Sequence, residues 1–460
     1  MKVLLSRRTI TPSGIGPKCV WIEGEVITRV DDYVDPSSEK HKAYFSSANE
    51  GIFDYGDLIL APGLVDTHVH INEPGRTEWE GFETATAAAA RGGVTTLMDM
   101  PLNSIPPTTT PLGVAAKVKA ADGKCSVDVA LCGGLVPENA EHLDEVAREG
   151  VFAFKAFMAP SGVDEFGHVD RTHLPVAMRT LADRGLPLLL HAELASNIDE
   201  AEKATLGDPK AYRTYLQSRP GSAEEAAIEL VFELAKDSGA RAHIVHLSAA
   251  PALRWIERAR LENVPLSVET CPHYLNFAAE TIPDGATAFK CAPPIREEAN
   301  RLGLWDGLRQ GLLTQVVTDH SPSSLDLKCV DSGNFMKAWG GISSLEIGLS
   351  AVWTAARARG HTPVDVARWM SEAPAKLVGL YGKKGAIAKG FDADICVWDD
   401  TSVRTIDVQT LQHRHKISPY DKKDLFGVVH ATYLRGTPIY LKTEASQSLR
   451  RGRILLRPPS

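Results

Sequence analysis

The sequence lacks any long hydrophobic run or cluster of basic residues, and each absence excludes a class of protein. No stretch approaches the 18 or so uncharged apolar residues that a membrane-spanning helix needs. The formal net charge is −8, and the sequence contains no run rich in Lys and Arg. Both features argue against nucleic acids and anionic membranes as partners. We therefore expect a cytoplasmic protein that acts on a small molecule.

Cysteine motifs and nucleophile motifs are missing as well. The seven cysteines are scattered and never spaced Cys-x-x-Cys, which excludes a disulfide framework and a thiolate zinc site. No Gly-x-Ser-x-Gly elbow occurs, and the Gly92-Gly93 and Gly133-Gly134 pairs lack the context of a phosphate-binding loop. The histidines therefore carry the most information about chemistry.

The middle of the chain has the rhythm of a βα-repeat protein. From residue 58 onward, short apolar runs alternate with helix-length, Ala-rich segments, which is typical of a parallel sheet. The predicted strands are 64–70, 94–100, 127–131, 151–157, 186–191, 242–247, 265–270 and 315–319, and clear helices include 83–91, 142–149, 223–238 and 252–262. Eight strands, each followed by a helix, favour an α/β fold of the (β/α)8 TIM-barrel class. A doubly wound sheet is the alternative, since counting strands cannot prove closure.

The two ends of the chain have a different texture. Residues 1–58 carry short alternating runs broken by Pro, Gly and Asp, which indicates small β hairpins. After a last helical stretch at 363–381, residues 385–399 return to strand texture. We predict that residues 59–382 form the barrel. Residues 1–58 and 383–460, which flank it in the sequence, should together form a small β-sandwich domain, and the second segment also includes a C-terminal tail.

One apolar run ends in two histidines, His68 and His70. Side chains alternate along a strand, so Asp66, His68 and His70 should share one face. Two neutral imidazoles on one face can converge on a single metal ion. Taken alone, this pattern is weak evidence among fifteen histidines, and His413-Arg-His415 repeats it without an apolar run before it.

Four other predicted strands also end in polar residues, namely Lys155, His191, His246 and Asp319. In a barrel the active site lies at the C-terminal ends of the strands. A single histidine or aspartate at a strand end is usually a core or turn residue. Here, however, five strands end in residue types that bind divalent metals, and this coincidence predicts a metal centre. His273 ends the seventh strand and His320 has the opposite parity to Asp319, so we assign both to structural or orienting roles.

Lys155 is the misfit in this set, because an ammonium repels a metal ion and loses hydration when buried. Its neighbours Phe154, Ala156 and Phe157 are apolar, so its amine is not obviously near water. A lysine that has reacted with carbon dioxide is instead an anionic carbamate, whose two oxygens can bridge two metals. That modification would turn Lys155 into a ligand.

The order His-x-His, Lys, His, His, Asp on successive strands resembles the amidohydrolase superfamily, in its cyclic-amidase branch of dihydroorotases, hydantoinases and allantoinases. The resemblance covers nearly the whole chain, including residues 385–394, which are similar to the segment that closes the family's small β domain. It implies two divalent ions, with zinc our first expectation, and a bridging hydroxide. The implied ligands are His68, His70 and Asp319 for one ion, His191 and His246 for the other, and carbamylated Lys155 for both. Asp319 would also be the catalytic base and then the acid.

Neighbouring residues distinguish the branches. Dihydroorotases have an arginine where this chain has Asn72, so a neutral substrate fits better, and hydantoinases have a tyrosine where this chain has Pro160. Segments 72–81, 98–107, 290–296, 319–322 and 415–420 are similar to those of allantoinases. The resemblance implies hydrolysis of the ring amide of allantoin to allantoate in purine degradation, by a homotetramer.

Substrate contacts are expected from Asn72, Asn103, Ala292 and the Gly340-Gly341 turn, where missing side chains let main-chain groups approach the ring. Two alternatives stay open. One is a cyclic amidase of the hydantoinase or dihydropyrimidinase type, which Pro160 disfavours. The other is a non-catalytic binding protein on the same scaffold, which would lack the metal ligands that this chain retains.

Overall fold

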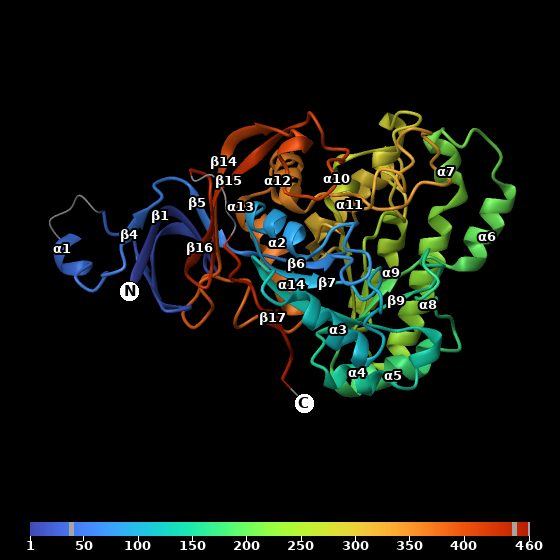
Figure 1. Ribbon diagram of the computed structural model, residues 1–460, viewed down its shortest axis with the longest axis horizontal. Helices are drawn as coiled ribbons and strands as arrows, with labels where there is room; N and C mark the ends of the chain where they lie inside the picture. Colours follow the sequence, from blue (N-terminus) through green and yellow to red (C-terminus); the bar gives the residue numbers. More distant parts are fainter. Residues whose placement is uncertain (36–40, 444–448, 459–460) are drawn as a thin grey trace.

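A computed structural model describes residues 1–35, 41–443 and 449–458 of the chain (Figure 1). Two sheets organise the molecule, one built from the middle of the sequence and one from its two ends. None of the helices in the described ranges is long and apolar enough to cross a membrane.

The first sheet consists of parallel strands that follow one another in chain order. They are β6 (Leu64–Val69), β7 (Val94–Asp99), β8 (Asp128–Gly134), β9 (Ala153–Phe157), β10 (Leu188–His191), β11 (Ala242–Ile244), β12 (Leu266–Thr270) and β13 (Gln315–Val316). Each lies within the run predicted from the sequence or overlaps it. After β13, His320 pairs with Val69, and the amide of His70 donates to the carbonyl of His320 over 2.8 Å. The last strand segment therefore meets the first, which confirms a barrel rather than a doubly wound sheet.

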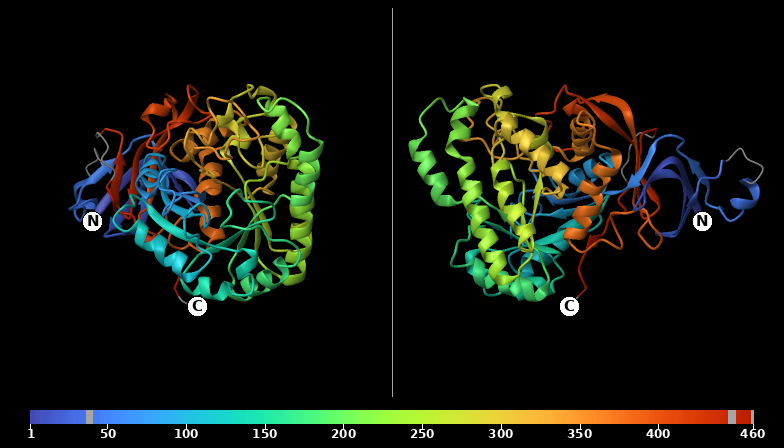
Figure 2. Two further views of the ribbon diagram at one scale, coloured as in Figure 1. Left: turned by 45° about the vertical axis from the view of Figure 1, so that its right-hand side comes forward. Right: turned by 180° about the vertical axis from the view of Figure 1, so that it is seen from behind.

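Helices surround the strands on the outside (Figure 2). They are α2 (Phe82–Arg91), α3 (Pro111–Ala121), α4 (Leu143–Arg148), α5 (Leu174–Arg184), α6 (Ala195–Ala204), α7 (Tyr212–Ser218), α8 (Gly221–Ser238), α9 (Leu253–Leu261), α10 (Pro272–Asn276), α11 (Glu298–Gln310), α12 (Gly348–Arg357), α13 (Pro363–Ala367) and α14 (Ala373–Leu377), with a π turn at Arg368–Glu372 between the last two. Short 3₁₀ turns occur at Pro137–Asn139, Ala250–Ala252, Ala279–Thr281, Thr287–Phe289, Leu345–Ile347 and Val408–Thr410.

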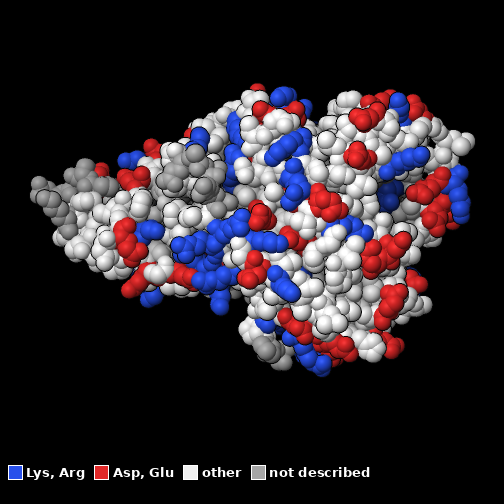
Figure 3. All heavy atoms as spheres, viewed as in Figure 1, with Lys and Arg blue, Asp and Glu red and all other residues white. Residues whose placement is uncertain are grey.

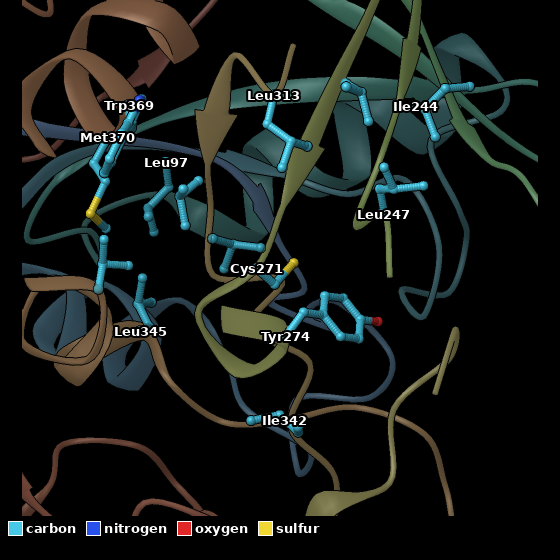
Figure 4. Close-up of a cluster of buried hydrophobic side chains, with 14 of the residues drawn as sticks. Leu97, Ile244, Leu247, Cys271, Tyr274, Leu313, Ile342, Leu345, Trp369 and Met370 are labelled. Atoms are coloured by element: carbon cyan, nitrogen blue, oxygen red, sulfur yellow. The ribbon is translucent and has the colours of Figure 1, made fainter. Parts of the chain in front are cut away.

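The longest helix, α8, shows why these segments are helical. Its buried side chains, among them Ala227, Ile228 and Val231, recur every three or four residues and so form one stripe toward the barrel. Gly239 ends the helix at φ 68°, a backbone conformation that glycine adopts without steric cost. Figure 4 shows part of the resulting core, where Leu97, Ile244 and other apolar side chains pack among the strands and outer helices.

The second sheet joins both ends of the chain. Its strands are β1 (Lys2–Thr11), β2 (Gly14–Glu23), β3 (Val26–Asp32), β4 (Ile52–Asp54), β5 (Ile59–Pro62), β14 (Ile395–Thr405), β15 (Asp424–Leu434) and β16 (Thr437–Leu441), in the order β16-β15-β14-β5-β1-β2-β3, with β4 beside β1. The short helix α1 (His41–Tyr44) precedes Phe45, which packs on the Trp21 side of this sheet. The N- and C-terminal segments therefore combine into one β unit, as the sequence predicted.

The end of the chain returns to the barrel. Strand β17 (Ile454–Leu455) pairs in parallel with β8, so the tail adds a strand to the barrel sheet. On the face shown in Figure 3, basic side chains gather between the second sheet and the barrel. Several arginines of this region have carboxylate partners, including Arg453 with Glu25 and Arg450 with Glu83.

Candidate active site and metal centre

A cavity of about 290 Å³ lies at the C-terminal ends of the barrel strands. All six residues predicted as metal ligands line it, namely His68, His70, Lys155, His191, His246 and Asp319. Lys155 lies in the middle of β9, and the others lie at the ends of β6, β10, β11 and β13 or in the residues just after them. The topology of the barrel therefore brings together side chains that lie as much as 251 residues apart, the separation of His68 and Asp319 (319 − 68).

His68, His70 and Asp319 form one tight cluster. The Nε2 atoms of His68 and His70 lie 3.2 and 3.5 Å from Asp319 Oδ1. Asp319 has φ 45°, an unusual conformation for a residue with a side chain. Asn72, Asn103 and His246 also have positive φ, so backbone strain concentrates around the cavity, as it does at many functional sites.

Asp66 does not join this cluster. Its carboxylate accepts hydrogen bonds from the amide and hydroxyl of Thr318, and it is not among the described residues that line the cavity. The pairing of β6 with β7 shifts between Asp66 and Val69, so the strict alternation assumed from the sequence fails at this point. Asp66 instead ties the first strand to the segment after β13.

Glu269, at the end of β12, fixes the orientation of His68. Its Oε1 lies 2.7 Å from His68 Nδ1, and its Oε2 accepts from His243 Nε2 and Gln315 Nε2. Burial alone would raise the pKa of Glu269, but the hydrogen bonds from His243 and His68 hold that pKa well below its usual range. An ionised carboxylate can only accept, so His68 carries a proton on Nδ1 and turns Nε2 toward the cavity.

Glu193 orients His191 in the same way. Its Oε2 lies 2.7 Å from His191 Nε2, and it also forms an ion pair with Arg219. Burial would raise the pKa of Glu193, but Arg219 and His191 lower it strongly. His191 therefore presents Nδ1 to the cavity, 3.0 Å from His246 Nε2. The chain thus places two imidazole pairs around the same space.

The electrostatics of these groups suit a cation. Burial lowers the pKa of His70 to about 4 and that of His246 well below its usual value, so both rings are neutral at physiological pH. Burial raises the pKa of Asp319, but His68 and His70 outweigh it and lower that pKa to about 2, so Asp319 is ionised. His68 Nε2 and Asp319 Oδ1 lie 3.2 Å apart, and both are atom types that bind divalent metal ions.

Lys155 lies beside both pairs and is fully buried. Its amine has no hydrogen-bond partner in the described part of the chain and lies 5.1 Å from the centre of the Phe157 ring. Burial lowers the pKa of Lys155 to about 8. A buried amine without a partner is an orphaned polar group, so its surroundings fit a modified lysine better than a free ammonium.

Two further histidines take the structural places expected of them. His320 is buried, accepts from the amide of Ser344 and contacts Glu80. His273 is also buried, and its ring nitrogens have no hydrogen-bond partner within the described ranges. Ligand-type atoms of His273, Cys271 and Asp319 lie within 4.8 Å of one another, so His273 borders the first cluster from behind.

Three of the four expected substrate contacts face the cavity. Asn103, Ala292 and Gly341 line it, together with Gly340. Asn72 is not among its described lining residues, and the Asn72 amide donates to the carbonyl of Pro322 over 3.4 Å. Gly341 has φ 141°, and a Cβ there would lie 2.2 Å from the carbonyl of Ser321, which explains the glycine.

Several functional residues escaped the sequence analysis. Glu269 and Glu193 were not singled out, although each stands at or near the end of a predicted strand, which was the available signal. Lys290 and Glu202 also line the cavity, from a loop and from α6. Lys290 begins the segment 290–296 that resembles allantoinases, which was the available signal, whereas no sequence pattern pointed to Glu202.

Comparison with known proteins agrees with this geometry. The model of the Amidohydrolase family matches residues 59–438. An allantoinase of Streptomyces avermitilis is 48% identical over 99% of both chains, and one of Arabidopsis thaliana is 42% identical over 95% of this chain and 87% of the relative. The solved L-hydantoinase (dihydropyrimidinase) from Arthrobacter aurescens superposes with a TM-score of 0.90 at 29% identity, covering 99% of this chain and 100% of that one.

Proposed function

This chain belongs to the amidohydrolase family, and we infer that it opens the hydantoin ring of allantoin by hydrolysis, giving allantoate. The observation that carries this inference is the convergence of the six polar residues on one cavity, in a chain whose near-full-length relatives are allantoinases. The ring amide is cleaved at its C–N bond, so a water oxygen becomes part of the new carboxylate and the ring nitrogen gains a proton.

We propose that the site holds two divalent ions, most simply zinc. The residues that would hold them are His68, His70 and Asp319 for one, His191 and His246 for the other, and Lys155, carbamylated, between them. The closeness of these ligand-type atoms and the orphaned Lys155 amine support this assignment. When bound, such ions lower the pKa of a water molecule and polarise the ring carbonyl.

The chain's own residues supply proton transfer and orientation. Asp319 is ionised and reaches the space between the imidazoles, so it accepts a proton from the attacking water and delivers that proton to the departing ring nitrogen. Glu269 and Glu193 keep the imidazoles in the tautomers described above. Main-chain groups at Gly340 and Gly341 lie where the ring can approach them without hindrance from side chains.

A hydantoinase or dihydropyrimidinase activity is the second candidate, because the Arthrobacter aurescens enzyme shares the fold over the full length. Turnover of allantoin, hydantoin and dihydrouracil by the metal-loaded protein separates the two. We expect the highest kcat/KM with allantoin. A higher value with hydantoin or dihydrouracil would favour the second activity, and no turnover of any of them would favour a binding protein.

The resemblance also supports a cytoplasmic homotetramer, which we propose on that basis. Sedimentation equilibrium of the purified protein tests the assembly, since a tetramer has four times the mass of the 49.8 kDa chain.

A further inference from the structure

Lys290 and Glu202 line the cavity without a charged partner. Lys290 is 8% exposed, and its Nζ donates to the carbonyl of Met336 over 3.3 Å. Within the described ranges, no carboxylate lies within ion-pair distance of Lys290, and the carboxylate of Glu202 on α6 has no hydrogen bond or ion pair. Arg219, which also lines the cavity, is by contrast already occupied by Glu193. Lys290 and Glu202 therefore keep their hydrogen-bonding capacity free for a ligand.

The structure holds Lys290 firmly in place. Its carbonyl accepts from the amide of Gly341 and from the buried amine of Lys328. Its amine lies 4.8 Å from the centre of the Tyr215 ring, and the hydroxyl of Tyr215 donates to the carbonyl of Cys291. A cation whose backbone and neighbours are fixed loses little entropy when it binds a ligand.

Lys290 lies toward the mouth of the cavity rather than at its floor. Its hydrogen-bond partner Met336 is 38% exposed, and Glu202 lies on the outer surface. Burial and Arg219 lower the pKa of Lys290 to about 8, and the carboxylate of Glu202 lines the same cavity without pairing with the Lys290 amine. A ligand group in this cavity could therefore accept a hydrogen bond from Lys290 and donate one to Glu202.

Allantoin carries such a group. Its reacting ring must lie at the floor, against the histidine clusters, so its ureido substituent extends toward the mouth. We propose that Lys290 and Glu202 form a subsite for this substituent, in which the Lys290 amine donates to the ureido carbonyl and the Glu202 carboxylate accepts from the ureido N–H groups. This inference rests on the proposed function and adds to it the residues that separate allantoin from unsubstituted hydantoin.

The contact is remote from the bond that breaks, so it should act on substrate and transition state alike. Loss of such a contact raises KM and leaves kcat nearly unchanged. For Lys290→Met we expect kcat/KM for allantoin to fall about 10- to 100-fold, the range for a hydrogen bond to a charged group. Glu202→Gln should lower it by roughly 3- to 10-fold, because that carboxylate is more exposed and more screened.

The control substrate is hydantoin, which lacks the ureido group. Its kcat/KM, or its inhibition constant against allantoin where turnover is too slow, should change by no more than about twofold in both variants. The control variant is Lys203→Met, which removes an exposed lysine of α6 beside Glu202 that does not line the cavity, and it should leave both substrates unaffected. Lys290→Arg should restore part of the allantoin activity.

The outcomes separate the two proposals. If the wild type does not open allantoin, the proposed function itself fails. If the wild type opens allantoin but Lys290→Met and Glu202→Gln leave its KM unchanged, or weaken allantoin and hydantoin equally, the subsite is wrong. A lowered thermal midpoint in Lys290→Met would reveal a structural loss, and the surface variant Glu202→Gln then decides the matter.

Discussion

At the scale of single residues, the site depends on carboxylates that touch no substrate. Glu269 holds the Nδ1 proton of His68 and also binds His243 and Gln315, so one buried side chain sets the direction of a proposed ligand. Partners of this kind raise the basicity of a histidine ligand and fix its ring.

Glu269→Gln should weaken metal binding without unfolding the protein. The amide cannot accept from both histidines as the carboxylate does, and we expect metal affinity to fall by about 10- to 100-fold. Competition with a chromophoric chelator measures this affinity. The matched control is Glu257→Gln, which changes an exposed glutamate on α9. Equal metal affinities in both variants would show that Glu269 does not support metal binding.

Lys155→Ala tests the proposed carbamate. Deletion of the side chain removes the anionic bridge, so metals and activity should be lost together. Acetate or propionate should restore part of the activity, because each brings two carboxylate oxygens into the vacated space. Methylamine should not, because it restores only an ammonium. Rescue by the amine but not by the acids would contradict the assignment.

The candidate ligands could be predicted at residue level because each one ends an apolar run, and a barrel collects the ends of its strands at one face. The sequence could not reveal which nitrogen of each ring points inward. That choice depends on Glu269 and Glu193, whose positions relative to His68 and His191 are set by packing between strands. Asp66 was misplaced because a local shift in pairing breaks the alternation that the prediction used.

At the scale of elements, the apolar runs in the sequence predicted where the strands lie, but they could not predict that the barrel closes. The eighth strand is only Gln315–Val316, and the barrel closes through His320 beyond it, which no periodicity indicates. The Gly340-Gly341 turn was expected to face the site, but the conformation of the loop that leads to it from Lys328 could not be predicted, since it depends on one buried amine. Lys328 donates to the carbonyls of Lys290, Trp339 and Gly341.

Lys328→Met should loosen the loop of residues 323–341, part of which lines the cavity. The apolar side chain leaves main-chain carbonyls without a donor, each at a cost of about 1–3 kcal/mol. We expect a lower free energy of unfolding, a raised KM, and faster amide hydrogen exchange over residues 323–341 than elsewhere. Lys337→Met, on the same loop but exposed, is the control. Unchanged amide hydrogen exchange in Lys328→Met would show that other contacts hold residues 323–341 in place.

At the scale of the whole molecule, a buried ion cluster joins the barrel to the second sheet and the tail. Lys384 binds Asp128 of β8 over 2.8 Å and Asp394 over 2.7 Å, and Arg435 binds Asp128 as well. The amide of Arg453 in the tail also donates to Asp128. Three segments distant in sequence therefore meet at one carboxylate.

Lys384→Met should destabilise the protein by about 3–5 kcal/mol, because it leaves buried carboxylates without their cation. Burial lowers the pKa of Lys384, but Asp394 and Asp128 outweigh it and raise that pKa above its ordinary value of 10.5. The contribution of Lys384 is therefore complete below pH 10.5 and is lost as the pH rises further. Urea unfolding at pH 7 and 9 should give the same difference between wild type and variant, and a difference that vanished by pH 9 would contradict this account.

The central claim is that allantoin hydrolysis depends on two ions held by the six residues of the cavity. Its most direct test is a titration of the metal-stripped protein with zinc in bicarbonate buffer, with bound metal and allantoin hydrolysis measured on the same samples. We predict no ring opening by the stripped protein and activity that rises until about two ions are bound per chain. Full activity in the metal-free protein, or two bound ions without any ring opening, would contradict it.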